Sequence, residues 1–474
     1  MWPLIVRNVL LPTYEALLQR PTLSLYRELL TQDDQLPDAI ERYQFERLKS
    51  LVRHAKENVS YWHGRVPEGR FEASTDLRTA LDCLPLMRRS DVKANLEAMR
   101  WRAAPCKAIL HNSSGTTDDN LYFYFDRNRQ AWDRALRMRA LARTGLLAGE
   151  RQLQFWPMPL YRDPVNRLKD PFRAARDLAR QGMAVDLRPL GQEQLDHGLD
   201  LLARYRPRLV VAYPSWLKLL ADRARMTGRS VRVPDVRLIL CTGEVLYTFQ
   251  RSAVEAMLGA RVVEEYGSHD AGILASEDAA GHWRVHWEHL CVEVLRDGRP
   301  ARAGEMGELV VTNLHSHIMP FIRYATGDVV TMPAASDDQG LLRASMPAIV
   351  GRCSDALLTT DGRLVENRDL VEMLVRETGT DVFSLFQPTR DRILCITTRT
   401  GGLADQQEKV ARILRLLLGR TLSVDCRIGA SFRPLKSGKH RFVCSPAANA
   451  VLAHDKRAGA SLARAWPQRI LDAD

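Results

Sequence analysis

Four hydroxyl side chains surround a glycine in the stretch Ser113–Thr117, just before an apolar run at 121–125. Small residues let backbone N–H groups approach a polyanion, and hydroxyls add further donors, so such loops can cradle phosphates. The G-x-x-x-x-G-K-[ST] loop occurs nowhere in the chain, so a Walker A site is excluded. The alternative interpretation is an ordinary turn, where Ser, Thr and Gly are common.

The stretch Glu264–Asp270 comes at the end of an apolar run that begins at Val262. A turn at the carboxyl end of a parallel strand is where α/β sheets place ligands. There Tyr266 could stack on a base, and the carboxylate of Asp270 could hold magnesium near phosphates. An ordinary polar loop is the alternative.

Three more motifs follow in the same order along the chain. The segment 307–328 ends at Gly327-Asp328, whose carboxylate can accept hydrogen bonds from ribose hydroxyls. The segment 350–355 stands where the composition indicates a domain boundary. The segment 434–441 is a basic loop with a glycine beside Lys439. Taken singly, these could be a capped hairpin, a linker and a basic surface turn.

The pattern of elements predicts an α/β protein of two domains. Residues 1–350 are expected to form a large N-terminal domain. Its first hundred residues read as helical, with a helix capped by Asp38 and another between Asp126 and Gly145. From residue 150, apolar runs alternate with helical stretches, which is typical of a parallel sheet, and 290–330 reads as a small β subdomain. Residues 351–474 are expected to form a small, mobile α+β domain carrying the lysine loop.

Composition narrows the function classes. The chain carries a net charge of +11 and eight widely spaced cysteines without a C-x-x-C pair. We expect reduced thiols, no transmembrane segment, no signal peptide and a cytoplasmic enzyme of unknown oligomeric state. The basic charge suits a polyanionic partner such as a nucleotide, coenzyme A, an acidic carrier protein, nucleic acid or an anionic membrane. The basic residues form no long run, which favours a solvated surface and no nucleic-acid partner.

Together the five motifs resemble the adenylate-forming superfamily of acyl-CoA synthetases, luciferases and adenylation domains. The pattern is most similar to the phenylacetate–coenzyme A ligase branch and its capsular-polysaccharide-type relatives. The resemblance spans about residues 40–445. Two positions depart from it, because Asp118 stands where the phosphate loop has glycine and Asp270 where the turn has glutamate.

The resemblance implies a role for each motif. Lys439 would be the catalytic lysine and Asp355 the hinge, while Asp270 would hold magnesium. Tyr213, His269 and Trp156 would contact the acid, with Trp216 as a further wall residue. The ATP-binding residues would be Ser113, Ser114, Gly115, Thr116, Thr117, Gly243, Glu244, Glu265, Tyr266, Gly267, Ser268, Asp328 and Arg352.

The reaction implied is attack of a carboxylate on the α-phosphorus of ATP with release of pyrophosphate. With Mg²⁺ present, the acyl-adenylate would pass to the thiol of coenzyme A or of a phosphopantetheinyl carrier protein. We expect an aromatic or other small organic acid. The alternatives are transfer to a non-thiol acceptor, a nucleotide-binding pseudoenzyme with Asp118 in its phosphate loop, and a non-catalytic basic protein that binds polyanions or membranes.

Overall fold

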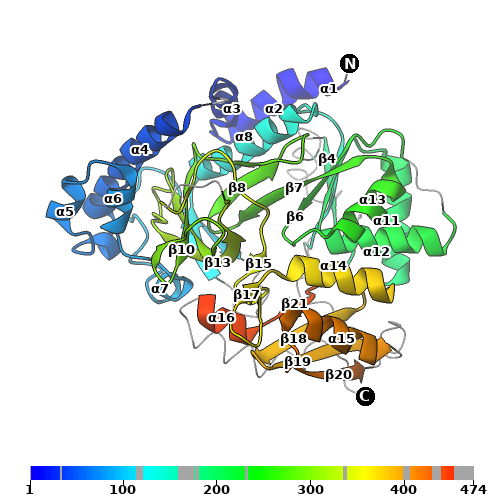
Figure 1. Ribbon diagram of the computed structural model, residues 1–474. Helices are drawn as coiled ribbons and strands as arrows, with labels where there is room; N and C mark the ends of the chain where they lie inside the picture. Colours follow the sequence, from blue (N-terminus) through cyan, green and yellow to red (C-terminus); the bar gives the residue numbers. More distant parts are fainter. Residues whose placement is uncertain are drawn as a thin grey trace.

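The computed structural model describes residues 2–32, 35–113, 121–157, 177, 181–229, 233–334, 339–398, 406–429 and 439–452. Figure 1 shows helices at the N-terminal end, a large sheet-containing body, and a smaller C-terminal lobe below it. This arrangement confirms the predicted mixed α/β class.

The first hundred residues are mainly helical, as predicted. In the longest helix, α4 (Pro37–Asn58), an apolar stripe that includes Ile40, Leu48 and Leu51 is completely buried against the rest of the body. The other elements of this part are α1 (Trp2–Ile5), η1 (Val6–Leu10), α2 (Leu11–Leu17), α3 (Thr22–Leu30), η2 (Ser60–Trp62), α5 (Glu68–Glu72), α6 (Leu77–Asp82) and α7 (Arg89–Ala94).

A seven-stranded sheet forms the centre of the body, in the order β4-β3-β5-β6-β7-β8-β9. Its first five strands run parallel, and β8 and β9 are antiparallel. The strand β5 reads Leu-Val-Val-Ala and is buried throughout, as expected for a strand covered on both faces. The bounds are β3 (Gln152–Phe155), β4 (Gly182–Val185), β5 (Leu209–Ala212), β6 (Leu238–Thr242), β7 (Arg261–Ser268), β8 (Gly272–Glu277) and β9 (Trp283–Val285).

Helices carry the crossovers of this sheet. The crossover helices are α11 (Gln192–Tyr205), α12 (Pro214–Met226) and α13 (Thr248–Leu258), and α8 (Arg127–Arg143) precedes the first strand, β3. The helix α8 follows a hairpin of β1 (Ile109–Ser113) and β2 (Leu121–Phe125), in which Ser113 pairs with Leu121. This pairing places Ser113 and Leu121 side by side; residues 114–120 lie outside the described residues.

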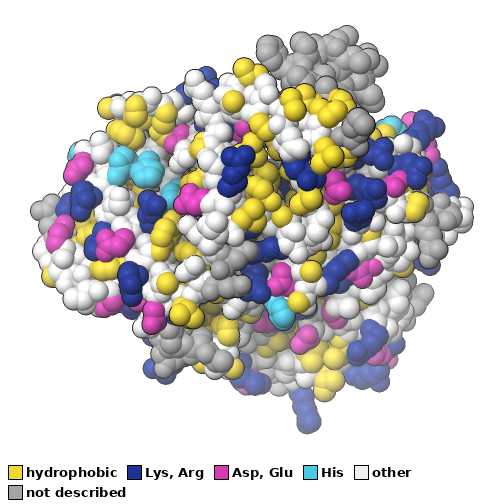
Figure 2. Space-filling view, turned by 90° about the horizontal axis from the view of Figure 1, so that it is seen from above, with side chains coloured by type: hydrophobic (Ala, Val, Ile, Leu, Met, Phe, Trp, Pro, Cys, Tyr) yellow, Lys and Arg dark blue, Asp and Glu magenta, His cyan; other side chains and the backbone are white. Residues whose placement is uncertain are grey.

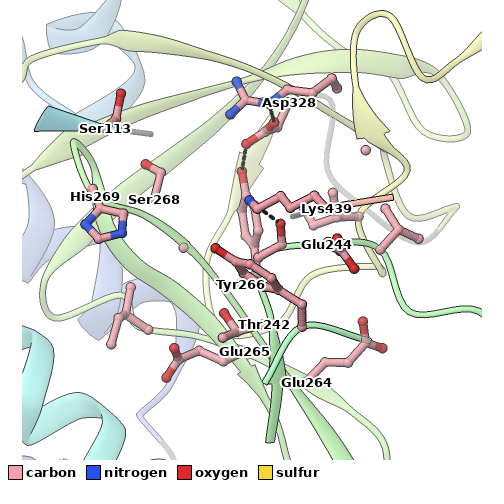
Figure 3. A pocket seen from close by; sticks show the side chains of 18 of the residues that line it. Ser113, Thr242, Glu244, Glu264, Glu265, Tyr266, Ser268, His269, Asp328 and Lys439 are labelled. Carbon is pink, nitrogen blue, oxygen red and sulfur yellow. Dashed lines mark hydrogen bonds and ion pairs between the residues drawn. The ribbon is translucent and has the colours of Figure 1, made fainter. Parts of the chain in front are cut away.

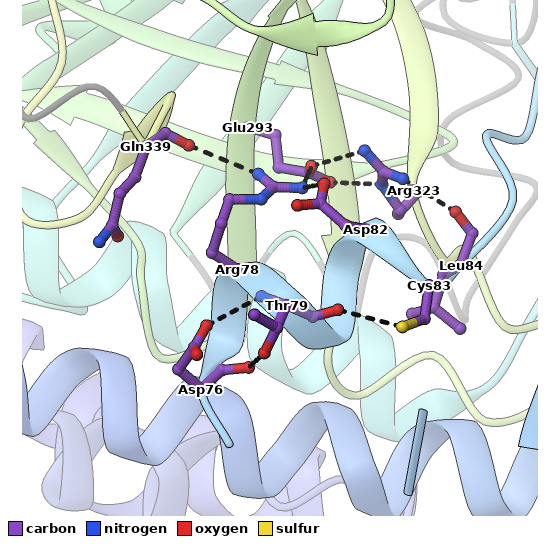
Figure 4. A network of polar contacts seen from close by, with 9 residues as sticks. All are labelled: Asp76, Arg78, Thr79, Asp82, Cys83, Leu84, Glu293, Arg323 and Gln339. Carbon is purple, nitrogen blue, oxygen red and sulfur yellow. Dashed lines mark hydrogen bonds and ion pairs between the residues drawn. The ribbon is translucent and has the colours of Figure 1, made fainter. Parts of the chain in front are cut away.

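The second sheet contains β10 (Leu290–Arg296), β11 (Arg299–Pro300), β12 (Met306–Asn313), β13 (Tyr324–Thr331), β14 (Leu341–Leu342) and β15 (Gly351–Arg352). Glu293 of β10 receives hydrogen bonds from Arg78 at 2.9 Å and from Arg323 at 3.0 and 2.9 Å. Arg323 also donates to the carbonyl of Leu84, which ties the helical segment to this sheet (Figure 4). Arg323 is therefore a buried structural residue that fixes the start of β13.

The small lobe consists of the hairpin β16 (Leu357–Leu358) and β17 (Leu364–Val365), followed by a four-stranded sheet and its helices. The sheet has the order β20-β19-β18-β21, with β18 and β19 antiparallel and the outer pairs parallel. Its elements are α14 (Asn367–Thr378), β18 (Phe383–Thr389), β19 (Arg392–Thr398), α15 (Gln407–Leu418), β20 (Ser423–Gly429), β21 (Val443–Cys444) and α16 (Pro446–Leu452). The boundary at residue 350 stays a prediction; β15, just beyond it, pairs with β13 of the body.

The surface and the cysteines match the composition. Figure 2 shows many Lys and Arg side chains lying beside Asp or Glu on the face that it presents. Examples of such ion pairs are Arg206–Asp235 at 2.5 Å and Arg223–Asp196 at 2.6 Å. All eight cysteines are free thiols. Within the described ranges, none of the helices has the length and apolar character needed to cross a membrane.

Candidate active site

A cavity of about 550 Å³ opens at the carboxyl ends of β6 and β7, between the body and the small lobe. Its walls come from α8, from β13 and β15, and from the segment that begins at Lys439. Carboxyl ends of parallel strands are where open α/β sheets bind ligands. Figure 3 shows that Asp328, Lys439, Tyr266 and His269 surround one space, although they are far apart in the sequence.

One end of the cavity is built around Asp328 of β13. The hydroxyl of Tyr266 donates to Asp328 at 2.7 Å, and Arg352 of β15 forms an ion pair with it at 2.9 Å. Burial raises the pKa of Asp328, while the positive charge of Arg352 acts in the opposite direction. Burial and the nearby carboxylate raise the pKa of Tyr266, so its hydroxyl remains a donor. This group can present a carboxylate and an aromatic ring to a nucleoside.

Lys439 reaches this cavity from the small lobe. Its Nζ donates to the carbonyl of Gly243 at 2.7 Å and lies 4.9 Å from the centre of the Tyr213 ring. Gly243 has φ +81°, and a Cβ there would lie 2.7 Å from the Tyr213 ring, so the position requires glycine. Desolvation lowers the pKa of Lys439, opposed by the charge of Glu244.

Glu244 holds the two lobes together beside that lysine. Its carboxylate accepts hydrogen bonds from the backbone N–H and the hydroxyl of Ser215, each at 3.0 Å, and from the N–H of His440, also at 3.0 Å. Burial raises the pKa of Glu244, and Lys439 opposes that shift. Glu244 therefore fixes the segment that presents Lys439, in addition to lining the cavity.

Asp355 lies at the junction between the lobes. Its carboxylate accepts from the backbone N–H of Arg352 at 2.7 Å and pairs with Arg441, which also bonds to Ser354. Gly351 has φ +131°, and a Cβ there would lie 2.6 Å from the Asp355 carboxylate. The chain thus folds tightly around Asp355 where it leaves the body.

Asp270 is the candidate magnesium ligand. Tyr324 donates to its carboxylate at 2.7 Å. Burial alone would raise the pKa of Asp270, but hydrogen bonds from Ser268 and Tyr324 and the charge of Arg352 bring it below its ordinary value. An ionised oxygen ligand suits Mg²⁺, which usually takes only one or two carboxylates from the protein. Among the described residues, no group of three or more His, Cys, Asp and Glu side chains is placed to hold a metal.

The far side of the cavity is aromatic and polar. Trp156 and Tyr213 lie with ring centres 4.6 Å apart, and His269 stacks on His111 at 5.2 Å. Burial lowers the pKa of His269 to about 4, so its imidazole is neutral near pH 7. Trp216 touches Tyr213 edge-on and is completely buried, so it supports the wall from behind.

Comparison with known proteins reveals relatives that are phenylacetate–coenzyme A ligases. The chain is 24% identical to a phenylacetate–coenzyme A ligase from Pseudomonas putida over 308 residues, which is 62% of this chain and 67% of the relative. It is 24% identical to one from Aromatoleum evansii over 334 residues, 68% of this chain and 72% of the relative. No family model matches. A 2-hydroxyisobutyryl-CoA ligase in the postadenylation state superposes with a TM-score of 0.66 at 15% identity, over 91% of this chain and 92% of the ligase.

These relatives support the predicted resemblance to the adenylate-forming superfamily. The similarity to phenylacetate–coenzyme A ligases agrees with the likeness that the motifs predicted. The solved structure shares the fold across almost its entire length, which confirms the predicted layout of a body with parallel strands and further α/β elements.

The structure brings most of the predicted superfamily residues to the cavity. Ser113 lines it, with Arg89 donating to its hydroxyl at 3.4 Å. Gly267 also belongs to the wall, and a Cβ on it would lie 2.7 Å from the carbonyl of Gly272. Ser114, Gly115, Thr116 and Thr117, together with Asp118, lie outside the described residues, so their roles stay predictions.

Sequence reasoning missed the wall that α8 provides. Gln130, Asp133 and Arg137 line the cavity, and Arg137 forms two hydrogen bonds with Glu265, one of them at 2.7 Å. Glu265, predicted as an ATP-binding residue, thus places its carboxylate against α8. The spacing of these α8 residues was a usable signal, because positions three and four apart share one face of a helix.

Proposed function

We propose that this chain is an acid–thiol ligase, which uses ATP to convert a carboxylic acid to its acyl-adenylate and then transfers the acyl group to a thiol. One observation carries the proposal. Lys439, from the small lobe, enters the same cavity in which Tyr266, Asp328 and Arg352 form a nucleoside-binding group. The likeness to phenylacetate–coenzyme A ligases supports it.

In the first half-reaction an oxygen of the carboxylate attacks the α-phosphorus of ATP. The new P–O bond forms as the bond to the β-phosphate oxygen breaks, and pyrophosphate leaves with no net proton transfer. Both reactants are anionic, so positive charge must hold them in line. The Lys439 ammonium has three N–H donors, of which the Gly243 carbonyl accepts one. We assign the other two to the carboxylate and the α-phosphate.

The remaining residues position the nucleotide. Tyr266 flanks the adenine, and Asp328 accepts hydrogen bonds from the ribose, with Arg352 balancing its charge. Ser113 begins the loop that holds the β- and γ-phosphates. Asp270 would hold Mg²⁺, which neutralises phosphate charge when bound.

The second half-reaction transfers the acyl group from AMP to sulfur. The thiolate attacks the acyl carbon, a C–S bond forms, and the C–O bond to AMP breaks. Coenzyme A is the acceptor that we propose, because the relatives of both kinds are named as coenzyme A ligases. A phosphopantetheinyl carrier protein offers the same thiol, and release of AMP with each acceptor distinguishes them.

The test is ATP–pyrophosphate exchange over a panel of aromatic and aliphatic acids, with Lys439→Ala as the key variant. We expect the wild-type protein to catalyse exchange with one class of acid, and the variant to lose it by at least about 100-fold, as for other groups that stabilise transition-state charge. Lys409→Ala is the matched control, because Lys409 is a lysine of the same lobe that pairs with Glu377 away from the cavity.

Equal exchange by Lys439→Ala and wild type would contradict the role of Lys439. Tight, salt-sensitive binding of polyanions without exchange for any acid would favour the non-catalytic alternative. Circular dichroism of both variants shows whether they are folded.

A further inference from the structure

The cavity extends beyond the groups that serve the nucleotide. Successive side chains of a strand point to opposite faces. On β7, Tyr266 faces Asp328, whereas Glu265 faces α8 and bonds to Arg137. In Figure 3, Glu265 points away from Asp328. In the same view Lys439 lies between these two residues in height. The space beside Glu265 is therefore the part of the cavity left for the acid.

We call the space beside Glu265 the acyl chamber, and one of its walls is polar. Gln130, Asp133 and Arg137 of α8 occur three and four residues apart and all line it, as does Gln154 of β3. Trp156 and Tyr213 form the facing aromatic wall. A chamber for a plain aryl or alkyl group would need no charged side chains, which cost free energy when a ligand desolvates them without pairing.

Asp133 has acceptor capacity to spare. Its Oδ1 accepts from the backbone N–H of Ile273 at 3.1 Å and lies 3.9 Å from Nε2 of His289, and its side chain is 31% exposed. Burial raises the pKa of Asp133, while the charges of Arg129 and Arg137 lower it. Within the described part of the chain, no donor reaches its Oδ2. A carboxylate oxygen in that position can accept a hydrogen bond from a ligand.

Arg137 has donor capacity to spare. Glu265 accepts from its Nε and Nη2, while the guanidinium carries five N–H groups and remains 40% exposed. The charges of Arg129, Asp133, Arg137 and Glu265 cancel, and Arg134, which also lines the cavity, pairs with Glu15 at 3.0 Å. The wall therefore favours a neutral group over an extra cation or anion. A hydroxyl is neutral, and it can donate to Asp133 and accept from Arg137.

We propose that the acid activated by this chain carries a hydroxyl group, bound between Asp133 and Arg137 in the acyl chamber. The proposal rests on the proposed function, because it names the substrate class of the same site. Asp133 would then be a specificity-determining residue, which leaves the chemistry at the α-phosphate unchanged.

The test compares kcat/KM for pyrophosphate exchange with matched acids that differ in one hydroxyl, such as hydroxyphenylacetates against phenylacetate and hydroxybutanoates against butanoate. We expect wild type to prefer a hydroxylated member by about 10-fold or more, because a site built to bond a hydroxyl rejects its analogue. Asp133→Ala should bring the ratio of kcat/KM for the hydroxylated and unsubstituted acids close to one. Asp133→Asn, which keeps the acceptor for Ile273, should retain part of the preference for the hydroxylated acid.

The outcomes separate this inference from the proposed function. A wild-type preference for the unsubstituted acid, or for an amino acid or a dicarboxylic acid of the same length, overturns the hydroxyl assignment and leaves the ligase activity standing. A ratio that Asp133→Ala does not change, with both rates falling together, shows that Asp133 is structural and overturns its role. Absence of exchange with every pair overturns both proposals.

Discussion

Burial sets the protonation of several carboxylates around the cavity, and Glu308 shows the consequence most clearly. Glu308 lies on β12 beside the strand that carries Asp328, and Arg88 lies 3.7 Å from it. Burial raises the pKa of Glu308 to about 7, more than the charge of Arg88 lowers it. Near neutral pH, ionisation of this carboxyl therefore costs free energy in the folded protein.

The sign of the pH dependence follows. Glutamate in the unfolded chain has a pKa of about 4.3, so between that pH and 7 the folded state binds more protons. The contribution of Glu308 to stability is complete below about pH 4.3 and is lost as the pH rises through 7. We expect Glu308→Gln to raise the free energy of unfolding by on the order of 1–3 kcal/mol over wild type at pH 8, and by much less at pH 4.5. Urea denaturation at both pH values measures this, and an equal difference at the two would contradict it.

At the scale of elements, periodicity predicted most of the architecture. The helix expected between Asp126 and Gly145 is α8, and Asp126 accepts from the N–H of Arg129 at 2.7 Å as an N-cap. The expected cap at Asp38 is wrong, because α4 begins at Pro37 and Asp38 lies in its first turn. Proline at the first helical position has φ fixed for a helix, so the chain can start there without a capping side chain.

The sequence predicted the site only where a motif is local. Tyr266, Asp328 and Lys439 stand in recognisable motifs, and they do meet at the cavity. The pairing of Arg137 with Glu265 joins residues 128 positions apart. Periodicity tells which residues share a face of α8, but the partner of that face depends on how the helix packs on the sheet.

The turn at β15 is an element whose shape depends on one glycine. We expect Gly351→Ala to lower stability by about 1–3 kcal/mol and to reduce turnover, because the added Cβ meets the Asp355 carboxylate and the backbone is strained. Gly362→Ala is the control, since Gly362 has φ +90° with open space around it and should cost only the backbone strain. Thermal unfolding and pyrophosphate exchange measure both effects. Similar losses in the two variants would show that the contact with Asp355 does not matter.

At the scale of the whole molecule, two lobes contribute to one cavity. The body supplies Asp328 and the wall of α8, whereas the small lobe supplies Lys439. The lobes meet through an apolar cluster, in which Tyr247 and Phe249 of the body pack against Phe442 of the small lobe. They also meet through Glu244, which bonds to His440, and through Asp355, which bonds to Arg441. These polar contacts lie on either side of Lys439, and Asp355 stands where the chain leaves the body. A hinge motion at Asp355 between the half-reactions is therefore our prediction.

Arg441→Ala tests that prediction. Removing the bonds to Asp355 and Ser354 should free the segment of Lys439 from its position at the cavity, and we expect pyrophosphate exchange to fall about 10-fold, because misplaced catalytic groups lose rate steeply. Thioester formation from a prepared acyl-adenylate does not need Lys439 at Gly243, so it should fall much less. Arg363→Ala is the matched control, because Arg363 is an exposed arginine of the same lobe whose side chain pairs with Asp361 of its own hairpin. Equal losses in both half-reactions would mean that Arg441 stabilises the lobe as a whole, and that the motion is not centred on Asp355.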